Sequence, residues 1–481
     1  MILLGIVLAC YGVATILVTK EMSFIDIGKI VAVFVVGFTL IILGIVFAQK
    51  RTLELLIEAS DLRLEKGKKN INIHSLIFNK KIYDKGPKVV VIGGGSGLNT
   101  VLRGLKNYTS NITAIVTVSD YGKIPTNSRK ELELLPSDDI KESIVSLAYD
   151  EESMEALFKY EFSKKLKGLN FGDIYLSAMK NTCGDFSESI YKSPNILRMT
   201  GRVLPVTLDE MKICAELENG MVVEEKSQIP EVVFDKVTKI NRIYISPSNC
   251  TPAAGVIEAI KDADAIIIGP GSLYTNVIPN LLIKNVAKTI KESKAIKIYV
   301  NNIMTEPGQT DNYSISEHIK AIIDHAGEGI IDYCIYDTGE IVPEFVRKYN
   351  KDGQDLVEQD IQKCKNLGIK MIQRNMSCII EGNIRHNPKE VAEAIIEIIC
   401  EDLKYKDKEN DPEYIMLNTR LKEEKRRKKN TKPIFKTKTK KNTKHEPKKA
   451  SKFNEKYKER IQSIQTSDEQ TIKNRKNMKN N

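Results

Sequence analysis

Hydrophobic and polar positions divide the chain into three regions. Residues 1–48 are mostly apolar, residues from about 88 to 400 alternate apolar runs with polar loops, and the end is basic and polar. Two stretches near the start, 1–19 and 30–48, contain no charged residue. Each has about the length that a helix needs to cross the hydrocarbon core of a bilayer. The pattern therefore predicts a transmembrane helical hairpin over residues 1–50.

Charges around this hairpin indicate its orientation. A short loop of mixed charge joins the two stretches, and basic residues beginning with Lys50 and Arg51 follow the second. Because basic flanks stay in the cytoplasm, we expect a cell-membrane protein whose main domain is cytoplasmic. A signal peptide is the alternative, but the first stretch lacks a basic start. Residues 51–86 then read as a linker helix that Gly86-Pro87 ends.

Apolar runs without alternation predict buried parallel strands in the middle of the chain. These runs lie in the first part of each of five segments, 88–92, 112–118, 264–272, 296–308 and 331–339. A helical period, with Leu98, Val101, Leu102 and Leu105 on one face, separates the first two. We therefore predict an α/β fold with a mostly parallel sheet over residues 87–402. In such a sheet, ligands bind beyond the carboxyl ends of the strands.

The loop after the first strand is rich in glycine. Strand, glycine turn and helix also begin a dinucleotide site, but the G-x-G-x-x-G spacing places Leu98 or Thr100 at the third glycine. A hydride-transferring dehydrogenase is therefore disfavoured. Backbone N–H groups in the turn Gly93–Gly97 and a helix N-terminus still favour an anion. We predict a phosphate or diphosphate site here, and a tight turn without ligand is the alternative.

A second loop, "GPGS" over residues 269–272, repeats this logic. Gly269 and Gly271 permit close backbone approach, and Ser272 and Thr275 offer hydroxyls. Two such turns at one sheet edge suit a diphosphate or a nucleotide-sugar, although "GPGS" alone also forms a simple turn and cap. Asn301-Asn302 follows another predicted strand. These two residues either contact the ligand or form a turn.

Charge is concentrated at the end of the chain. The net charge is +10, and residues 420–481 contain 23 Lys/Arg and 7 Asp/Glu, a net of +16 that leaves about −6 elsewhere. The folded part is therefore not a basic nucleic-acid-binding body. Residues 403–481 are predicted to be a disordered basic tail, either solvated or in contact with anionic lipid, RNA or an acidic protein. Eight scattered cysteines without a CxxC pair indicate reduced thiols.

Several segments in order resemble the bacterial gluconeogenesis factor family, which is related to 2-phospho-L-lactate transferase of coenzyme F420 synthesis. The similarity covers about residues 87–401 and is carried by "KVVVIGGGSGLNTVLRGLK", "TGRVLPVTLDE", "DADAIIIGPGSLYTNVIPNLL", "IYVNNIMTEPGQTDNYSISEHI" and "RHNP". The resemblance implies a Rossmann-like domain with helices on both faces of the sheet. It also implies either UDP-sugar binding linked to cell shape, or a transferase that uses a guanosine diphosphate carrier and a divalent metal.

This chain departs from the family pattern at polar positions. The departures are Tyr121 for an acid, Lys141 for Arg, Glu142 for Asn, Leu169 for His and Asp173 for Asn. Losing an acid–base or charge-stabilising group commonly costs orders of magnitude in rate, whereas binding can survive. We therefore interpret the chain as a membrane-anchored, nucleotide-sugar-binding regulatory protein linked to cell shape and envelope synthesis. A Mg²⁺-dependent transferase is the alternative.

The glycine turns, the strand ends and the family resemblance together indicate candidate ligand-binding residues. Arg202 is a candidate phosphate partner or a surface ion pair, His386 is structural, and His318 and His325 are assigned to no metal. Asp120 and Asp139 are the candidate ligands if Mg²⁺ is present. The predicted ligand-binding residues are Gly93, Gly94, Gly95, Ser96, Gly97, Asn99, Asp120, Asn170, Gly172, Asp173, Arg202, Gly269, Gly271, Ser272, Thr275 and Asn301.

Overall fold

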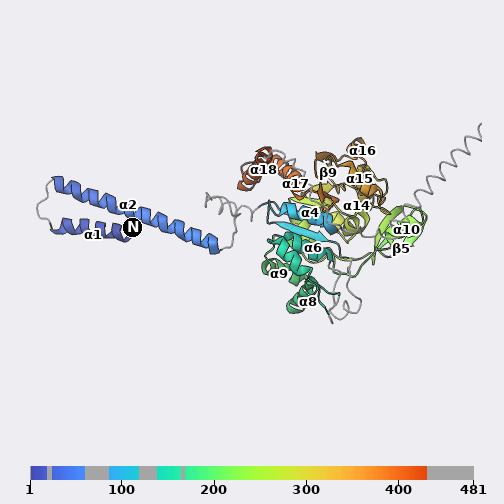
Figure 1. Cartoon of the computed structure of the whole chain (residues 1–481), viewed down its shortest axis with the longest axis horizontal. Coiled ribbons are helices and arrows are strands. Elements are labelled where there is room, and N and C mark those ends of the chain that lie inside the picture. Colours follow the sequence, from blue (N-terminus) through green and yellow to red (C-terminus); the bar gives the residue numbers. More distant parts are fainter. Residues whose placement is uncertain (1, 19–23, 60–85, 119–137, 164–167, 431–481) are drawn as a thin grey trace, which may run out of the picture. The chain divides into compact units, whose positions relative to one another are not determined.

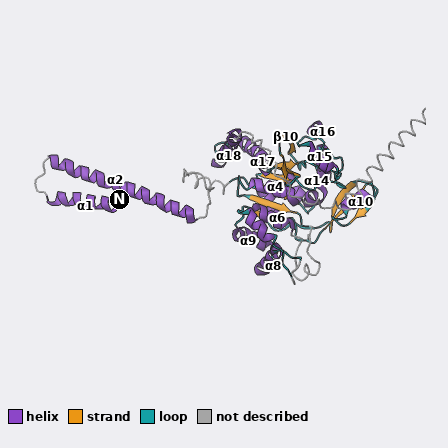
Figure 2. Ribbon diagram, in the orientation of Figure 1, coloured by secondary structure: helices purple, strands orange, loops and turns teal. Residues whose placement is uncertain are grey.

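The computed structural model describes residues 2–18, 24–59, 86–118, 138–163 and 168–430. It divides into two compact units, Met1–Lys81 and Ile82–Asn481. The first is helical, and the second combines helices with strands (Figures 1 and 2). Each unit is described by itself below.

The N-terminal unit contains two helices, α1 (Ile2–Val18) and α2 (Phe24–Ala59). Within α2, Ile27–Gln49 is long and apolar enough to cross a membrane, whereas the apolar part of α1, Leu4–Val18, is shorter. One apolar helix therefore fits a membrane anchor, and a second crossing by α1 stays a prediction. The expected boundary at residue 50 is not a helix end, because α2 continues to Ala59.

The second unit is built on a sheet of seven parallel strands in the order β10-β9-β8-β7-β1-β2-β3. The chain extends the sheet from β1 to β3 on one side, then returns to add β7 to β10 on the other. The topological switch point therefore lies between β1 and β7. The strands are β1 (Val89–Gly93), β2 (Ile112–Val116), β3 (Arg202–Pro205), β7 (Ala265–Ile268), β8 (Ile296–Val300), β9 (Tyr333–Asp337) and β10 (Lys370–Arg374).

Helices cover both faces of this sheet, as predicted. Alternate side chains of β1 enter two separate hydrophobic cores, Val89 and Val91 on one face and Val90 and Ile92 on the other. The apolar runs of the strands are continuous because neither face of the sheet is exposed to solvent. The first core contains α4 (Gly95–Leu105), α6 (Asp138–Leu147) and α17 (Pro388–Tyr405), and the second contains α11 (Val256–Asp262), α13 (Val286–Glu292) and α14 (Ile315–Ala326).

Two insertions interrupt the alternation of strand and helix. Between β2 and β3 lie α7 (Glu151–Phe158), α8 (Phe171–Cys183) and α9 (Phe186–Leu197). Between β3 and β7 lies a small antiparallel sheet in the order β5-β4-β6, formed by β4 (Lys212–Leu217), β5 (Val222–Val223) and β6 (Ile240–Ser246), with α10 (Ile229–Asp235) before β6.

Several short elements complete the second unit before the last two helices. They are the π-helical turn η2 (Leu273–Val277), α12 (Ile278–Leu281), α15 (Pro343–Asn350), α16 (Ile361–Asn366) and the hairpin of β11 (Ser377–Ile380) and β12 (Asn383–His386).

The start of the expected disordered tail is instead a helix, α18 (Pro412–Asn430). Tyr414, Leu417 and Leu421 are spaced by three and four residues and are buried in the core that contains α17. The high lysine and arginine content of this segment conceals that apolar stripe, so composition alone predicted disorder. Residues 431–481, the rest of the predicted tail, lie outside the described residues.

Candidate functional site

The two predicted glycine turns meet at the switch point. The first follows β1 and opens α4, and the second follows β7. A Cβ atom on Gly97 would lie 2.3 Å from the carbonyl oxygen of Pro270, and one on Gly271 would lie 3.1 Å from that of Gly94. Only glycine at position 97 allows this approach, because any side chain would overlap backbone. The turns are therefore in direct backbone contact.

A polar cavity of about 180 Å³ opens between these turns. The segments Gly94–Gly97 and Pro270–Ser272 form one side of it. The other sides come from Asn276, from the loop 302–306 after β8, from Tyr349 and Gln354, and from Ile384–His386 at β12. The cavity therefore collects residues from five separate parts of the chain at the carboxyl edge of the sheet.

Backbone amides make the floor of the cavity suitable for an anion. The first-turn N–H groups of α4, including those of Ser96 and Gly97, have no acceptor within the helix. Two further amides have side-chain acceptors: Gly95 donates to Asp139 Oδ1 at 2.9 Å, and Gly271 donates to Asn302 Oδ1 at 3.0 Å. An incoming phosphate would therefore use the remaining amides or replace these side chains.

Two carboxyl groups flank the cavity. Asp139, at the start of α6, lies against Gly94 and Gly95. Glu306 accepts a hydrogen bond from Ser272 Oγ at 2.5 Å. Burial raises the pKa of Glu306 above its usual value, and the bond from Ser272 only partly opposes this. Within the described residues no group of three or more His, Cys, Asp or Glu side chains could hold a metal, so the Mg²⁺ assignment stays a prediction.

Basic and imidazole groups reach the cavity from distant segments. Lys226, after β5, donates to Asn276 Oδ1 at 3.0 Å, and Arg385 lines the rim. His386 Nε2 lies 3.0 Å from the carbonyl oxygen of Asn301, which can only accept, so Nε2 carries the hydrogen. Burial lowers the pKa of His386, which leaves a neutral ring whose Nδ1 is an acceptor. The sequence predicted a structural role for His386, but it did not predict that His386 lines the cavity.

The structure brings six predicted residues to the cavity wall: Gly94, Gly95, Ser96, Gly97, Gly271 and Ser272. Gly93 and Gly269 belong to the same two turns. Asn301 is buried beside the cavity, where its Nδ2 donates to the carbonyl oxygen of Asn302 and its Oδ1 has no hydrogen-bond partner among the described residues. Asp120 lies outside the described residues.

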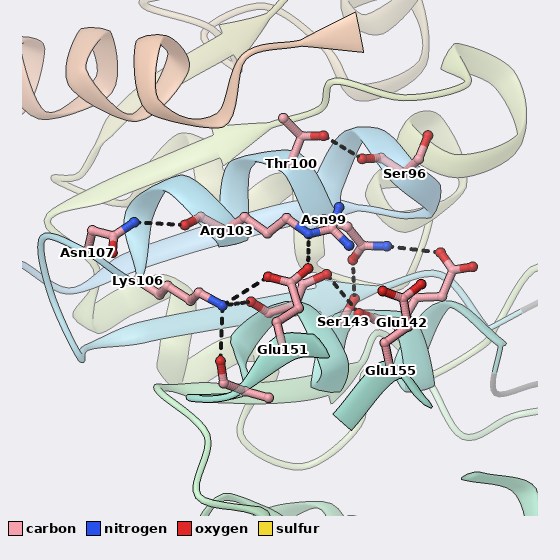
Figure 3. Close-up of polar contacts among 12 residues, drawn as sticks. Ser96, Asn99, Thr100, Arg103, Lys106, Asn107, Glu142, Ser143, Glu151 and Glu155 are labelled. Carbon is pink, nitrogen blue, oxygen red and sulfur yellow. Dashed lines mark hydrogen bonds and ion pairs between the residues drawn. The ribbon is translucent and has the colours of Figure 1, made fainter. Parts of the chain in front are cut away.

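Asn99 and Thr275 do not face the cavity, which corrects their assignment. Asn99 Nδ2 donates to Glu142 Oε2 at 3.0 Å, and its Oδ1 accepts from Ser143 Oγ at 3.1 Å. Figure 3 shows this side chain directed from α4 toward the residues of α6. The reason is helical geometry: two positions along a helix rotate a side chain by about 200°, so Asn99 points away from the side on which Gly97 meets Pro270. Thr275 is buried within η2.

Asn170, Gly172 and Asp173 also have structural positions rather than the predicted ligand positions. Asn170 and Asp173 form a reciprocal capping box at the start of α8. Asp173 is fully buried and forms an ion pair with Lys141 of α6, whose side chain is 7% exposed. Gly172 lies against the Lys141 stem. Two departures from the family pattern, at positions 141 and 173, therefore contact each other.

Arg202, a predicted ligand-binding residue, lies at the opposite edge of the sheet and does not line the cavity at the glycine turns. It begins β3, so it stands at the amino ends of the parallel strands, whereas both glycine turns follow carboxyl ends. Its Nε donates to Thr113 Oγ1 at 3.0 Å.

A doubly wound parallel sheet with glycine turns meeting at its switch point defines a Rossmann-like protein with a ligand cavity at the carboxyl edge. Residues 89–377 match the family described as 2-phospho-L-lactate transferase CofD, and the chain belongs to that family. This confirms the resemblance inferred from the sequence.

Similar proteins carry the name gluconeogenesis factor. That of Bacillus subtilis is 37% identical over 317 residues, which cover 66% of this chain and 99% of the relative. That of Halalkalibacterium halodurans is 40% identical over 316 residues, 65% of this chain and 97% of the relative. A crystal structure of a Bacillus halodurans protein superposes with a TM-score of 0.61 at 39% identity, and covers 65% of this chain and 99% of that one. The N-terminal helical unit is an addition to these relatives.

Proposed function

We propose that the chain is a membrane-anchored regulatory protein of the gluconeogenesis factor type that binds a UDP-sugar-like nucleotide and acts on cell shape and envelope synthesis. One observation carries the proposal: two glycine turns in backbone contact form one polar cavity at the β1/β7 switch point. The names of the relatives support the type of protein.

The diphosphate is the part of the ligand that this cavity fits. Its volume of about 180 Å³ is smaller than the roughly 300 Å³ at which pockets for whole drug-sized ligands begin. The anion would lie over the first turn of α4, where the helix dipole favours negative charge. Lys226 and Arg385 would supply countercharge, and the sugar and base would extend across Tyr349 and Gln354 at the rim.

Regulation fits this chain better than catalysis. Lys141 and Asp173, which replace an arginine and an asparagine of the family pattern, neutralise each other inside the protein and do not line the cavity. Charge that is committed to an internal pair is not available to stabilise a transition state. The remaining amides and hydroxyls are sufficient for binding.

A Mg²⁺-dependent transferase is the second candidate. It is favoured by the Asp139 carboxylate at the first glycine turn and by the acceptor Nδ1 of His386 at the cavity. In that case the purified chain should consume a nucleotide-diphosphate-linked carrier only with Mg²⁺. Asp139→Asn should then abolish turnover.

Calorimetric titration of the full chain in neutral detergent tests the binding proposal. We expect saturable binding of a UDP-sugar in preference to GDP and NADH. Lys226→Gln should weaken it roughly tenfold, because it removes one hydrogen bond from a charged group. Lys236→Gln, an exposed lysine of the same insertion, is the matched control and should bind normally. Absence of binding by every nucleotide would overturn the proposal.

A further inference from the structure

A second and larger cavity, of about 470 Å³, lies at the amino edge of the main sheet. Its floor is formed by the first residues of β1, β2 and β3, including Lys88, Asn111 and Arg202. Its wall is formed by Tyr191 and Pro194 of α9. It shares no lining residue with the cavity at the glycine turns, because the strands of the sheet run between the two edges.

Arg202 is held in this cavity by a hydrogen bond to the neighbouring strand β2. Thr113 stands directly opposite it in the β2–β3 register and accepts a hydrogen bond from its Nε at 3.0 Å. This bond fixes the guanidinium plane and leaves both terminal nitrogens to donate. No carboxylate in the described part of the chain forms an ion pair with it. Three other arginines each pair with a glutamate: Arg103 with Glu151, Arg242 with Glu216 and Arg374 with Glu397.

The backbone constrains the position of this arginine. Gly201, the residue before it, has φ of +74°, and a Cβ atom there would lie 2.5 Å from the carbonyl oxygen of Ile112. Only glycine lets the start of β3 approach β2 this closely. Arg202 therefore reaches Thr113 from a fixed backbone, unlike an arginine on a free surface loop.

The walls of the cavity indicate what accompanies the anion. Tyr191, Pro194 and Asn195 share one face of α9, and Tyr191 is 64% exposed. Lys88 is paired with Asp262 at 3.5 Å, so the cavity is not a general basic patch. A guanidinium fork matches the oxygens of a phosphate, and an exposed ring beside it favours a flat or apolar substituent.

We propose that this cavity is a second ligand site, for a phosphate ester with an aromatic or apolar substituent, distinct from the proposed nucleotide site. Two sources carry this chemistry, a soluble phosphate ester and the headgroup of an anionic lipid. The second source is relevant because the chain also contains an apolar helix that fits a membrane anchor.

A fluorescence experiment can test the site directly. The chain contains no tryptophan, so Tyr191→Trp places a single reporter in the cavity wall. Phenyl phosphate, titrated into this full-length variant in neutral detergent, should change its emission in a saturable way. Adding Arg202→Gln should weaken the apparent affinity roughly tenfold or more. Arg198→Gln removes the same charge from an exposed arginine outside the cavity and should have no effect.

Further variants and lipids separate the possible outcomes. Thr113→Val removes the hydroxyl that orients the guanidinium and should also weaken binding, so the test does not depend on the folding of one variant. In nanodiscs, an emission change on adding phosphatidic acid to phosphatidylcholine would identify a lipid headgroup. A UDP-sugar should not compete, so this site can fail independently of the nucleotide site. No saturable response to either phosphate source, or a response that Arg202→Gln leaves unchanged, would overturn the proposal.

Discussion

At the residue scale, the chain shows how paired substitutions keep a buried charge compatible with folding. Lys141 and Asp173 lie on α6 and α8, and both side chains are almost completely enclosed. Asp138 gives Lys141 a second carboxylate at 2.7 Å, and Asn170 completes the cap around Asp173. Buried ions are tolerated only when every partner is present, so this group behaves as one structural unit.

Removing the lysine from this group should be strongly destabilising. We expect Lys141→Met to cost about 3–5 kcal/mol, because it leaves the Asp173 carboxylate buried without its cation. Lys159→Met breaks an exposed pair with Glu155 and should cost about 0–1 kcal/mol. Urea unfolding of the α/β unit measures both. Equal, small effects of the two substitutions would contradict the structural role of the buried pair.

Glu306 should give the protein a pH dependence of the opposite sign to that of a salt-bridged carboxylate. Burial, the main cause, raises its pKa above 4.5, so the folded state holds the proton more tightly than the unfolded state. Its contribution to stability is complete below pH 4.5 and is lost as the pH rises through the folded-state pKa. Glu306→Gln should therefore be more stable than the wild type at neutral pH, and this gain should shrink toward pH 4.

Thermal midpoints between pH 4 and pH 8 measure this difference. Glu344→Gln, at an exposed position of α15, is the matched control and should show no such trend. A gain for Glu306→Gln that is constant across the range would show that the effect does not come from the titration of this carboxyl.

At the element scale, what the sequence could predict depended on how completely each element is buried. Strands covered on both faces, such as Ala265–Ile268, form continuous apolar runs and were predicted correctly. The edge strand β10 is only partly buried, β3 is four residues long, and the small antiparallel sheet has exposed positions, so these gave no comparable signal.

The candidate site divides in the same way. Its glycine turns could be predicted because each directly follows a buried strand. Lys226, Glu306 and His386 could not, because they come from an insertion, a loop and a hairpin whose approach to the cavity depends on the complete fold. Asn99 was misplaced because one position along a helix rotates a side chain by about 100°, so proximity in sequence did not mean a shared direction.

The helix α18 should contribute to stability despite its basic composition. A chain that ends after Asp411 loses Tyr414, Leu417 and Leu421 from the core shared with α17. Because burying one such side chain stabilises by about 1.5–3 kcal/mol, we expect a loss of several kcal/mol. A chain that ends after Asn430 keeps the whole helix and is the control. Calorimetric melting of both truncations against the full chain tests this, and equal midpoints would contradict it.

At the scale of the whole molecule, the chain joins a unit with one clearly membrane-length apolar helix to a Rossmann-like unit. Relatives such as the Bacillus subtilis protein match 66% of this chain over 99% of their own length. The family match over residues 89–377 lies wholly within the second unit, so the apolar helix lies outside it. An apolar helix of this length fits a membrane anchor.

Removing residues 1–50 should therefore change where the protein is found and leave its ligand binding intact. The full chain should stay with membranes after alkaline carbonate extraction, and the truncated chain should appear in the soluble fraction. If the basic C-terminal segment contributes by binding anionic lipid, high salt should release the truncated chain as carbonate does, since such attraction is screened. Recovery of the full chain in the soluble fraction would contradict anchoring.

The backbone contact between Gly97 and Pro270 limits how a ligand can enter. The two loops touch through backbone atoms, with no side chain between them. They cannot separate without losing this packing, so we expect this side of the cavity to be rigid. Entry and release would then depend on the opposite side, which is lined by Tyr349 and by the hairpin that ends at His386. The rate of ligand exchange would be determined by this opposite side. Substitutions there should alter the residence time of the ligand before they alter its equilibrium affinity.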